Sequence, residues 1–450
     1  MIPYIPHTDA DRERMLKAIG VATMDELFSD IPSGILYGKE LPIGAGLSEE
    51  EVLGQFKHLA GLNRVGVSFL GMGSYDHIIP SAVKDLSALP AFVTSYTPYQ
   101  PEISQGLLQA IFEFQTMVCE LTGLDVANAS LYDGHSAAAE AAAMMLASKR
   151  KSTVVLVSET VHPFTLEVLK TWCYGTGFSI RTITECNRTT DITGIPGLLD
   201  AQVAGVLVQS PNRYGFIEDY TDLARSVHEN GSLLTISSDP LSLVIQRSQG
   251  EWDADIAIGD TQPLGLPCAF GGPSCGYIAV REALMRKLPG RIVGQTVDTG
   301  GKRAFTLTLQ AREQHIKRER ATSNICSNQA LAALTTTIYL SLVGYAGMLE
   351  AARSSQDKAQ YLARQLVGTP HVVMGGTAPF WCEFPLVFDT VETMEKTLAA
   401  LLAEGLHGGI RLGTLTGRPA DASTCVVAVT EKRTKAELDR YVRIVREVLA

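Results

Sequence analysis

Four polar segments follow strands that we expect between residues 153 and 280. They are His162 and residues 209–212, 237–239 and 260–262, and they supply imidazole, carboxylate and amide groups. In an open parallel sheet, ligands bind at the edge where the carboxyl ends of the strands meet. The sequence therefore predicts a binding site for a polar ligand at this edge.

A short turn at residues 134–136 precedes an alanine-rich helix. Gly134, His135 and Ser136 would offer free backbone N–H groups and the positive end of the helix dipole, which suits a phosphate group. Ser136 would serve equally well as an ordinary N-cap of that helix. Both interpretations stay open from the residues alone.

Two irregular segments are rich in side chains that can donate or accept hydrogen bonds. The first is a proline-containing loop with Tyr96, Tyr99, Gln100 and Glu102, and the second breaks a helical tract and holds Ser323, Asn324, Cys326 and Asn328. Prolines at 98 and 101 exclude a regular helix or central strand from the first segment. Such loops often carry function. The alternative is a surface turn with ordinary polar residues.

Alternating strands and helices must position these residues. We expect strands at 153–158, 178–183, 204–209, 232–237, 255–259 and 275–280, with helices at 163–174 and 219–230. Strands separated by helices indicate a mainly parallel sheet covered on both faces. The predicted fold class is therefore α/β.

The chain divides into three predicted regions. Residues 1–65 form a helical arm, 66–345 a large α/β domain, and 346–450 a small α+β domain. Beyond Leu307 we expect a long helical tract with a break at residues 322–329. Arms of this kind usually wrap a partner subunit, by analogy with other proteins.

Composition narrows the class of protein. A net charge of −10 over 450 residues argues against nucleic acid or an anionic membrane surface as partner. Eight cysteines without a C-x-x-C pair favour reduced thiols and no metal site. The sequence shows neither a signal peptide nor an apolar span of 18 residues. We therefore expect a soluble, cytoplasmic protein.

Four motifs carry a resemblance to a known family. They are Tyr-Thr-Pro-Tyr-Gln-Pro-Glu-Ile-Ser-Gln-Gly at 96–106, Phe-Gln-Thr-Met-Val-Cys-Glu-Leu-Thr-Gly at 114–123, Asn-Ala-Ser at 128–130, and Arg-Glu-Arg-Ala-Thr-Ser-Asn-Ile-Cys-Ser-Asn-Gln at 318–329. Nearly the whole chain resembles the P-protein of the glycine cleavage system. The resemblance implies the aspartate-aminotransferase fold, fold type I, of enzymes that depend on pyridoxal 5'-phosphate (PLP).

At this length the chain resembles the alpha subunit, or subunit 1, of P-proteins that are split into two subunits. Gln262 stands where such enzymes carry the lysine that binds PLP, and an amide nitrogen cannot attack the PLP aldehyde. The resemblance implies that subunit 2 binds PLP through its lysine, in an α2β2 complex. With that partner, glycine would be decarboxylated and the aminomethyl group transferred to the lipoyl arm of the H-protein, whereas the isolated chain would be inactive.

The resemblance also implies roles for individual residues. His162 would stack on the pyridine ring, Asp239 would pair with its nitrogen, and the turn at 134–136 would hold the phosphate, in a site degenerate because of Gln262. The residues of the two irregular segments would contribute to the active site shared with the partner. The alternative is that the degenerate site is a relic of gene duplication.

Two other functions remain open. The chain could be a stand-alone PLP-dependent aminotransferase or lyase that uses another lysine. The candidates are Lys149, Lys151, Lys170, Lys287 and Lys302, none of which ends a predicted core strand. The chain could also be a purely structural partner of an active subunit.

Overall fold

The computed structural model describes residue 4 and residues 6–94, 97–149, 151–321 and 323–450. The chain forms two compact units, the first of which ends at Arg64 and the second of which begins at Val65. The first unit contains helices α1 (Asp9–Ile19) and α2 (Glu49–Gly61), with a 3₁₀ turn between them. Thr8 and Ser48 form capping boxes that start the two helices. No described side chain of this unit is buried.

A seven-stranded sheet forms the centre of the second unit. In spatial order its strands are β2 (Val126–Ala127), β10 (Gly276–Val280), β9 (Ile256–Asp260), β8 (Leu233–Ser237), β7 (Val203–Gln209), β3 (Val154–Ser158) and β4 (Ser179–Ile183). The five strands from β9 to β4 run parallel, and β10 is antiparallel to both of its neighbours. The predicted parallel sheet is confirmed.

Strand β3 shows why both faces of this sheet are covered. Its five residues are all buried, and successive side chains point to opposite faces. Val155 and Val157 pack with the alanine-rich helix on one face, whereas Val154 and Leu156 belong to the cluster on the other face. A strand that is apolar on both sides must lie between two layers of helices.

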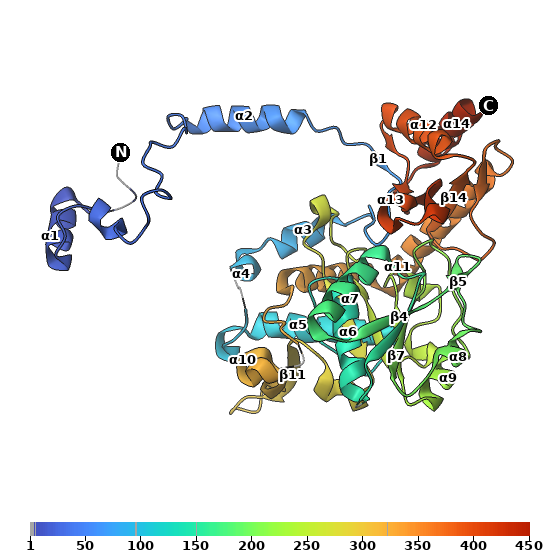
Figure 1. The fold of residues 1–450 in the computed structure, drawn as a ribbon, viewed down its shortest axis with the longest axis horizontal. Helices are drawn as coiled ribbons and strands as arrows, with labels where there is room; N and C mark the ends of the chain where they lie inside the picture. Colours follow the sequence, from blue (N-terminus) through green and yellow to red (C-terminus); the bar gives the residue numbers. More distant parts are fainter. Residues whose placement is uncertain (1–3, 5, 95–96, 150, 322) are drawn as a thin grey trace. The chain divides into compact units, whose positions relative to one another are not determined.

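The helices supply those two layers (Figure 1). Helices α6 (Gly134–Ser148) and α7 (Pro163–Thr176) pack on one face. Helix α9 (Leu223–Glu229) covers part of the opposite face, and α5 (Gln105–Thr122) covers another part together with α11 (Ala330–Leu366). Thus the carboxyl ends of the parallel strands remain the open edge at which a ligand can bind.

A smaller antiparallel sheet lies near the C-terminus. Its strands, in spatial order, are β13 (Val372–Met374), β14 (Glu383–Phe388), β17 (Thr424–Ala428) and β16 (Ile410–Arg411). Helices α12 (Val391–Ala403) and α14 (Lys435–Leu449) pack on it, together with the end of α11 (Figure 1). Strand β1 (Val67–Ser68) pairs with β15 (Leu406–His407), so residues from both sides of the predicted division at 345–346 share a small sheet. That division stays a prediction.

The region between Leu288 and Ala330 contains a hairpin that was not predicted, and the predicted helical tract beyond Leu307 begins later than expected. Strands β11 (Ile292–Val297) and β12 (Arg303–Thr308) form a hairpin that the sequence analysis did not predict. Residues 310–320 contain only short helical turns, and the continuous helix α11 begins at Ala330. The helical tract predicted between Leu307 and the break at 322–329 was therefore wrong, because these residues form only short turns.

Helix α11 also corrects the expectation that the chain has no apolar span of 18 residues. By length and composition it is the one helix among the described residues that could cross a membrane. Buried residues such as Tyr339 and Leu362 place its two halves in separate apolar clusters of the fold. Its backbone leaves the helical conformation at Gly344, where φ is 56°. The composition of α11 thus fits a long core helix.

Candidate functional site

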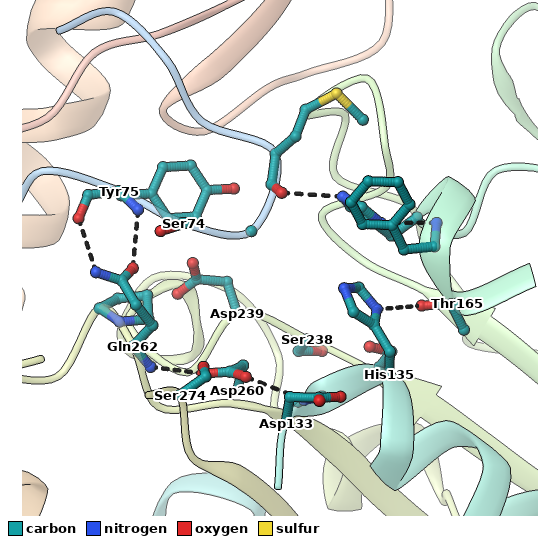
Figure 2. Close-up of a pocket in the computed structure, with 18 of the residues that line it drawn as sticks. Ser74, Tyr75, Asp133, His135, Thr165, Ser238, Asp239, Asp260, Gln262 and Ser274 are labelled. Atoms are coloured by element: carbon teal, nitrogen blue, oxygen red, sulfur yellow. Dashed lines mark hydrogen bonds between the residues drawn. The ribbon is translucent and has the colours of Figure 1, made fainter. Parts of the chain in front are cut away.

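A cavity of about 500 Å³ lies at the carboxyl ends of the central strands. We call it the strand-end pocket. Its wall contains the ends of β7, β8 and β9, the start of α6, and the loops at 72–75 and 267–274. Trp381, Cys382 and Glu383 contribute from the start of β14 in the smaller sheet. The pocket brings together Gly134, His135, His162, Asp239 and Gln262, as the sequence predicted for a ligand site (Figure 2).

Gln262 is held in place by three hydrogen bonds. The backbone N–H of Tyr75 donates to its Oε1 (2.8 Å), while its Nε2 donates to the carbonyl oxygens of Tyr75 (3.0 Å) and Leu266 (2.9 Å). The amide therefore pairs with the backbone of Tyr75 as a neighbouring strand would, and Figure 2 shows both of these bonds. Gln262 fastens the loop at 72–75 over the pocket.

Carboxylates occupy the N-terminus of α6. Asp260 Oδ2 accepts a hydrogen bond from the backbone N–H of Gly134 (3.0 Å), and Asp133 Oδ1 accepts one from that of Ser136 (2.7 Å). Asp133, and not Ser136, is the N-cap. Asp260 is fixed further by the Ser274 hydroxyl, at 2.5 Å. Two N–H groups of the turn that was expected to hold a phosphate, those of Gly134 and Ser136, are therefore already bonded to carboxylates.

The two pocket histidines lie against each other, with ring centroids 4.7 Å apart. His162 Nδ1 accepts a hydrogen bond from the Phe164 N–H (3.1 Å), so Nε2 carries the proton that it donates to the Met72 carbonyl (3.0 Å). Burial and the neighbouring His135 lower the pKa of His162 to about 3. Burial also lowers the pKa of His135. Both rings are uncharged at neutral pH.

Two further acids line the pocket, the buried Glu383 and the half-buried Asp239. Glu383 accepts hydrogen bonds from the Met72 N–H and from the Tyr75 hydroxyl, the latter at 2.8 Å. Burial raises the pKa of Glu383 to about 7, and the charge of Asp239 adds to this shift. Burial likewise raises the pKa of Asp239 to about 6. Glu383 therefore holds the loop at 72–75 at Met72 and Tyr75.

The two irregular segments meet at Arg291, a residue that the sequence analysis did not identify. Its guanidinium donates hydrogen bonds to the hydroxyl of Tyr99 and to the carbonyl oxygen of Cys326, both at 2.8 Å. Weaker contacts of 3.4 Å reach Thr97 Oγ1 and Asn328 Oδ1. We call these five residues the Arg291 cluster. It unites Tyr99, Cys326 and Asn328 from the predicted contributors.

The other predicted contributors do not join this cluster. Gln100, Glu102 and Asn324 are exposed. The Ser323 hydroxyl donates to Glu140 at 2.9 Å, away from both Arg291 and the strand-end pocket. Tyr96 lies outside the described residues.

The Arg291 cluster adjoins the strand-end pocket through one loop. Asn328 Nδ2 donates to the Ala129 carbonyl (3.1 Å) and the Ser130 hydroxyl (3.2 Å). The backbone N–H of the following residue, Gln329, donates to that same hydroxyl (3.1 Å), and Gln329 lines the pocket. A change at Arg291 can therefore reach the pocket wall through directly bonded residues.

Sequence reasoning missed Tyr75, Glu383 and Arg291. A glutamate at the start of an otherwise apolar strand, as at Glu383, is a signal that could have been used, because such residues are rarely buried without a partner. Arg291 immediately precedes a strand that was not predicted, so no comparable signal was available there.

The pocket does not fit covalently bound PLP. No lysine lines it among the residues that the structure describes. Lys149, one of the alternative candidates, instead donates to the carbonyl oxygens of Val203 and Asn230, where strand β7 starts. Gln262 cannot form an imine, and the Asp260 carboxylate already binds the Gly134 N–H at the start of α6.

Similar structures define the class of protein. Glutamate decarboxylase from Lactobacillus brevis superposes with a TM-score of 0.67 at 12% identity, over 91% of this chain and 94% of that one. At this identity the similarity shows the fold alone. The chain has the fold of the PLP-dependent enzymes of fold type I.

The family follows from closer relatives. The sequence model of the glycine cleavage system P-protein family matches residues 3–445 of this chain. A protein named probable glycine dehydrogenase (decarboxylating) subunit 1, from Bacillus cytotoxicus, is 48% identical over 98% of both chains. A crystal structure of glycine decarboxylase (P-protein) in inhibitor-bound form has a TM-score of 0.88 at 39% identity, covering 99% of this chain and all of that one. The chain belongs to the glycine cleavage system P-protein family.

Proposed function

We propose that this chain is the subunit of a two-subunit P-protein that lacks the PLP lysine. Together with a lysine-bearing subunit 2, it decarboxylates glycine and transfers the aminomethyl group to the lipoyl arm of the H-protein. PLP, bound covalently by the partner, supplies the electron sink for decarboxylation. The complex is an α2β2 heterotetramer in the cytoplasm, and the isolated chain is inactive.

Gln262 is the observation that carries the proposal. It lies two residues after β9, at the position where enzymes of this class carry the PLP lysine. Its side-chain amide is hydrogen-bonded to the backbone of Tyr75 and Leu266. The side chain serves the architecture of the loop at 72–75. Chemistry that needs a lysine must therefore come from another chain.

The N-terminal unit supports a permanent partner. Apolar side chains such as Val52, Phe56, Leu59 and Leu62 are exposed on or just after α2. Exposed apolar patches of this kind mark interaction surfaces, and no described side chain before residue 65 is buried. We assign this surface to subunit 2, whose fold would resemble that of this chain.

The Arg291 cluster supports a part in the shared active site. Tyr99 is 57% exposed, yet two contacts with Arg291 fix its ring and hydroxyl in one position. Donors held in place before binding lose little freedom when a ligand arrives. In the complex, this cluster would place donors at the edge of the partner's site and exclude water from it.

Borohydride reduction of the co-expressed complex tests the assignment. Mass spectrometry of the two chains should find phosphopyridoxyl-lysine on subunit 2 and none on this chain. Size-exclusion chromatography with mass measurement should show both chains in one particle. A phosphopyridoxyl-lysine on this chain would favour a stand-alone PLP enzyme. Elution of the two chains in separate peaks at micromolar concentration would contradict the proposed complex.

A further inference from the structure

Residues 281–320 form a basic region in an otherwise acidic chain. Ten of the chain's 38 lysines and arginines lie there, against four of its 48 aspartates and glutamates, so this segment has a net charge of +6 and the rest of the chain −16. Six of the ten cations lie on the short helical turns at 282–287 and 310–320. We call these six residues the basic patch: Arg286, Lys287, Arg312, Lys317, Arg318 and Arg320.

The cations of the basic patch have few internal partners of opposite charge. In the described part of the chain, Arg320 is the one member with an ion pair, to the exposed Glu319 at 3.6 Å. Glu313 lies within the same turns, but its side chain is only 6% exposed. The exposed members of the patch are Arg286, Lys317, Arg318 and Arg320. Exposed cations without internal partners create a positive field that attracts an acidic group from another molecule.

Arg312 lies at the centre of this patch. It is half-buried, and its Nη1 donates to the carbonyl oxygen of Leu288, whereas its Nε and Nη2 have no partner among the described residues. The hollow beside it has a volume of about 10 Å³, which is no more than one water molecule needs. The patch therefore has no cavity for a small anion.

The surface around the hollow has the features of a protein contact. Helix α10 (Gln314–Lys317) carries Ile316, which is 51% exposed, directly before two cations of the patch. An apolar side chain within a charged surface resembles the apolar centre and polar rim of protein interfaces. The basic patch therefore fits the acidic surface of another protein.

The basic patch borders the Arg291 cluster. Gly290, which directly precedes Arg291, lines the hollow of the patch. Two residues of the segment at 323–328 also line it, and the Cys326 carbonyl of that segment accepts a hydrogen bond from Arg291 at 2.8 Å. A protein that binds the patch would therefore lie next to the donors assigned above to the shared active site.

The charge of the patch favours a transient partner over a permanent one. Permanent subunit interfaces are mainly apolar, and charged side chains are depleted at their centres. Complementary charge instead speeds the encounter of partners that bind and dissociate repeatedly. In the proposed reaction, the lipoyl carrier is the partner that must bind and dissociate in every turnover.

We propose that the basic patch is the docking surface for an acidic face of the lipoyl carrier, the H-protein. Carboxylates of the carrier pair with Lys317, Arg318 and Arg320, and the docked carrier extends its lipoyl arm past the Arg291 cluster. This inference rests on the proposed function and deepens it, because it assigns recognition of the carrier to this chain and not to subunit 2.

Reversal of two exposed charges tests the proposal in the co-expressed complex. The variant Lys317→Glu/Arg320→Glu should raise the KM for H-protein at least about tenfold and leave kcat within about twofold of the native value. The control Arg225→Glu/Lys396→Glu makes the same change in net charge at exposed positions of α9 and α12, and it should leave both constants unchanged. Neutralisation, as in Lys317→Ser/Arg320→Ser, should raise the KM by a smaller factor than reversal.

Two further measurements separate docking from chemistry. Free lipoamide has the dithiolane ring of the arm but no protein surface, so the native and charge-reversed complexes should react with it equally. An increase in NaCl from about 50 to about 200 mM should raise the KM of the native complex for H-protein severalfold, because salt screens exposed charges. The same increase should not raise the KM of the charge-reversed complex.

Four results would overturn the proposal. They are an unchanged KM in the charge-reversed complex, an equal rise in the control, slower reaction of the charge-reversed complex with free lipoamide, and loss of the complex on size exclusion. The last of these would make the basic patch a contact with subunit 2.

A binding measurement decides the proposal without catalysis. Biolayer interferometry with immobilised H-protein should show at least about tenfold weaker binding of the charge-reversed complex than of the native and control complexes. Equal binding would overturn the proposal. Because this measurement needs no turnover, failure of carrier docking and failure of the proposed function are distinguishable.

Discussion

Arg291 and Tyr99 are joined by two different contacts. The guanidinium carbon of Arg291 lies 4.7 Å from the centroid of the Tyr99 ring, and the guanidinium also donates a hydrogen bond to the Tyr99 hydroxyl at 2.8 Å. Arg291 is buried, and all four groups that accept its hydrogen bonds are uncharged. The position of the Tyr99 loop thus depends on a cation at the start of β11.

Tyr99→Phe should slow decarboxylation by the assembled complex. The change keeps the ring over Arg291 and deletes the hydroxyl. Loss of one such group in a water-poor site typically costs about 1–3 kcal/mol, or roughly ten- to a hundredfold in rate. Steady-state decarboxylation measures it, with assembly confirmed by sedimentation. Tyr174→Phe, at a residue 94% exposed on α7, is the control.

A native decarboxylation rate for Tyr99→Phe would show that the Tyr99 hydroxyl does not contribute to the active site. The equivalent change Tyr96→Phe tests the same loop separately. If both variants keep the native rate, the chain acts as a scaffold for its partner, and the Arg291 cluster serves only to stabilise the loop.

Gln262→Leu should destabilise the isolated chain. Leucine removes three hydrogen bonds and leaves the buried backbone N–H and carbonyl of Tyr75 without those partners. We expect a loss of about 2–4 kcal/mol in the free energy of unfolding. Urea denaturation measures it, and the exposed substitution Gln100→Leu should change it by less than about 0.5 kcal/mol. Equal midpoints for the two variants would show that Gln262 does not hold the loop.

Glu383→Gln should alter how stability depends on pH. Because burial raises the pKa of Glu383 to about 7 in the folded chain, its stabilising effect is complete below the unfolded pKa of about 4.5 and is lost as the pH rises through 7. The native chain should lose up to about 3 kcal/mol from this group over that range, a loss that the variant avoids. Urea titrations at pH 5 and 8 compare the two, and parallel curves would contradict the prediction.

Gly71→Ala should be strongly destabilising. A Cβ at this position would lie 2.0 Å from Glu383 Oε1 and 2.5 Å from the Ala428 Cβ, so the chain that leads into the loop at 72–75 must move. We expect a loss of about 2–4 kcal/mol. Gly106→Ala, in α5 with open space around the added methyl group, should be neutral or stabilising by about 0.5–1 kcal/mol. Thermal unfolding of both variants checks the difference.

Regular packing made much of the fold predictable. Most strands of the central sheet agree with the apolar pattern within a few residues, because inner strands such as β3 are buried on both faces. The hairpin of β11 and β12 escaped prediction because only one part of it is buried, and its exposed end has no apolar signal. Local patterns identify elements that enter the core more readily than elements that flank it.

The candidate site was predictable only in part. His162, Asp239 and Gln262 were found because they end predicted strands, so their positions followed from topology. Glu383 and Tyr75 reach the same pocket from sites 308 residues apart in the chain, through a bond that no local pattern encodes. The hydrogen bond from the Gly134 N–H to Asp260 could not be predicted for the same reason, since it joins two segments that are distant in the sequence.

Glycine–bicarbonate exchange tests the central claim most directly. The assay would use purified subunit 2 and this chain, each alone and mixed, with PLP and lipoylated H-protein present. The account predicts no exchange by this chain alone, full exchange by the mixture, and a loss of exchange when subunit 2 lacks its PLP lysine. Exchange catalysed by this chain in the absence of subunit 2 would contradict it.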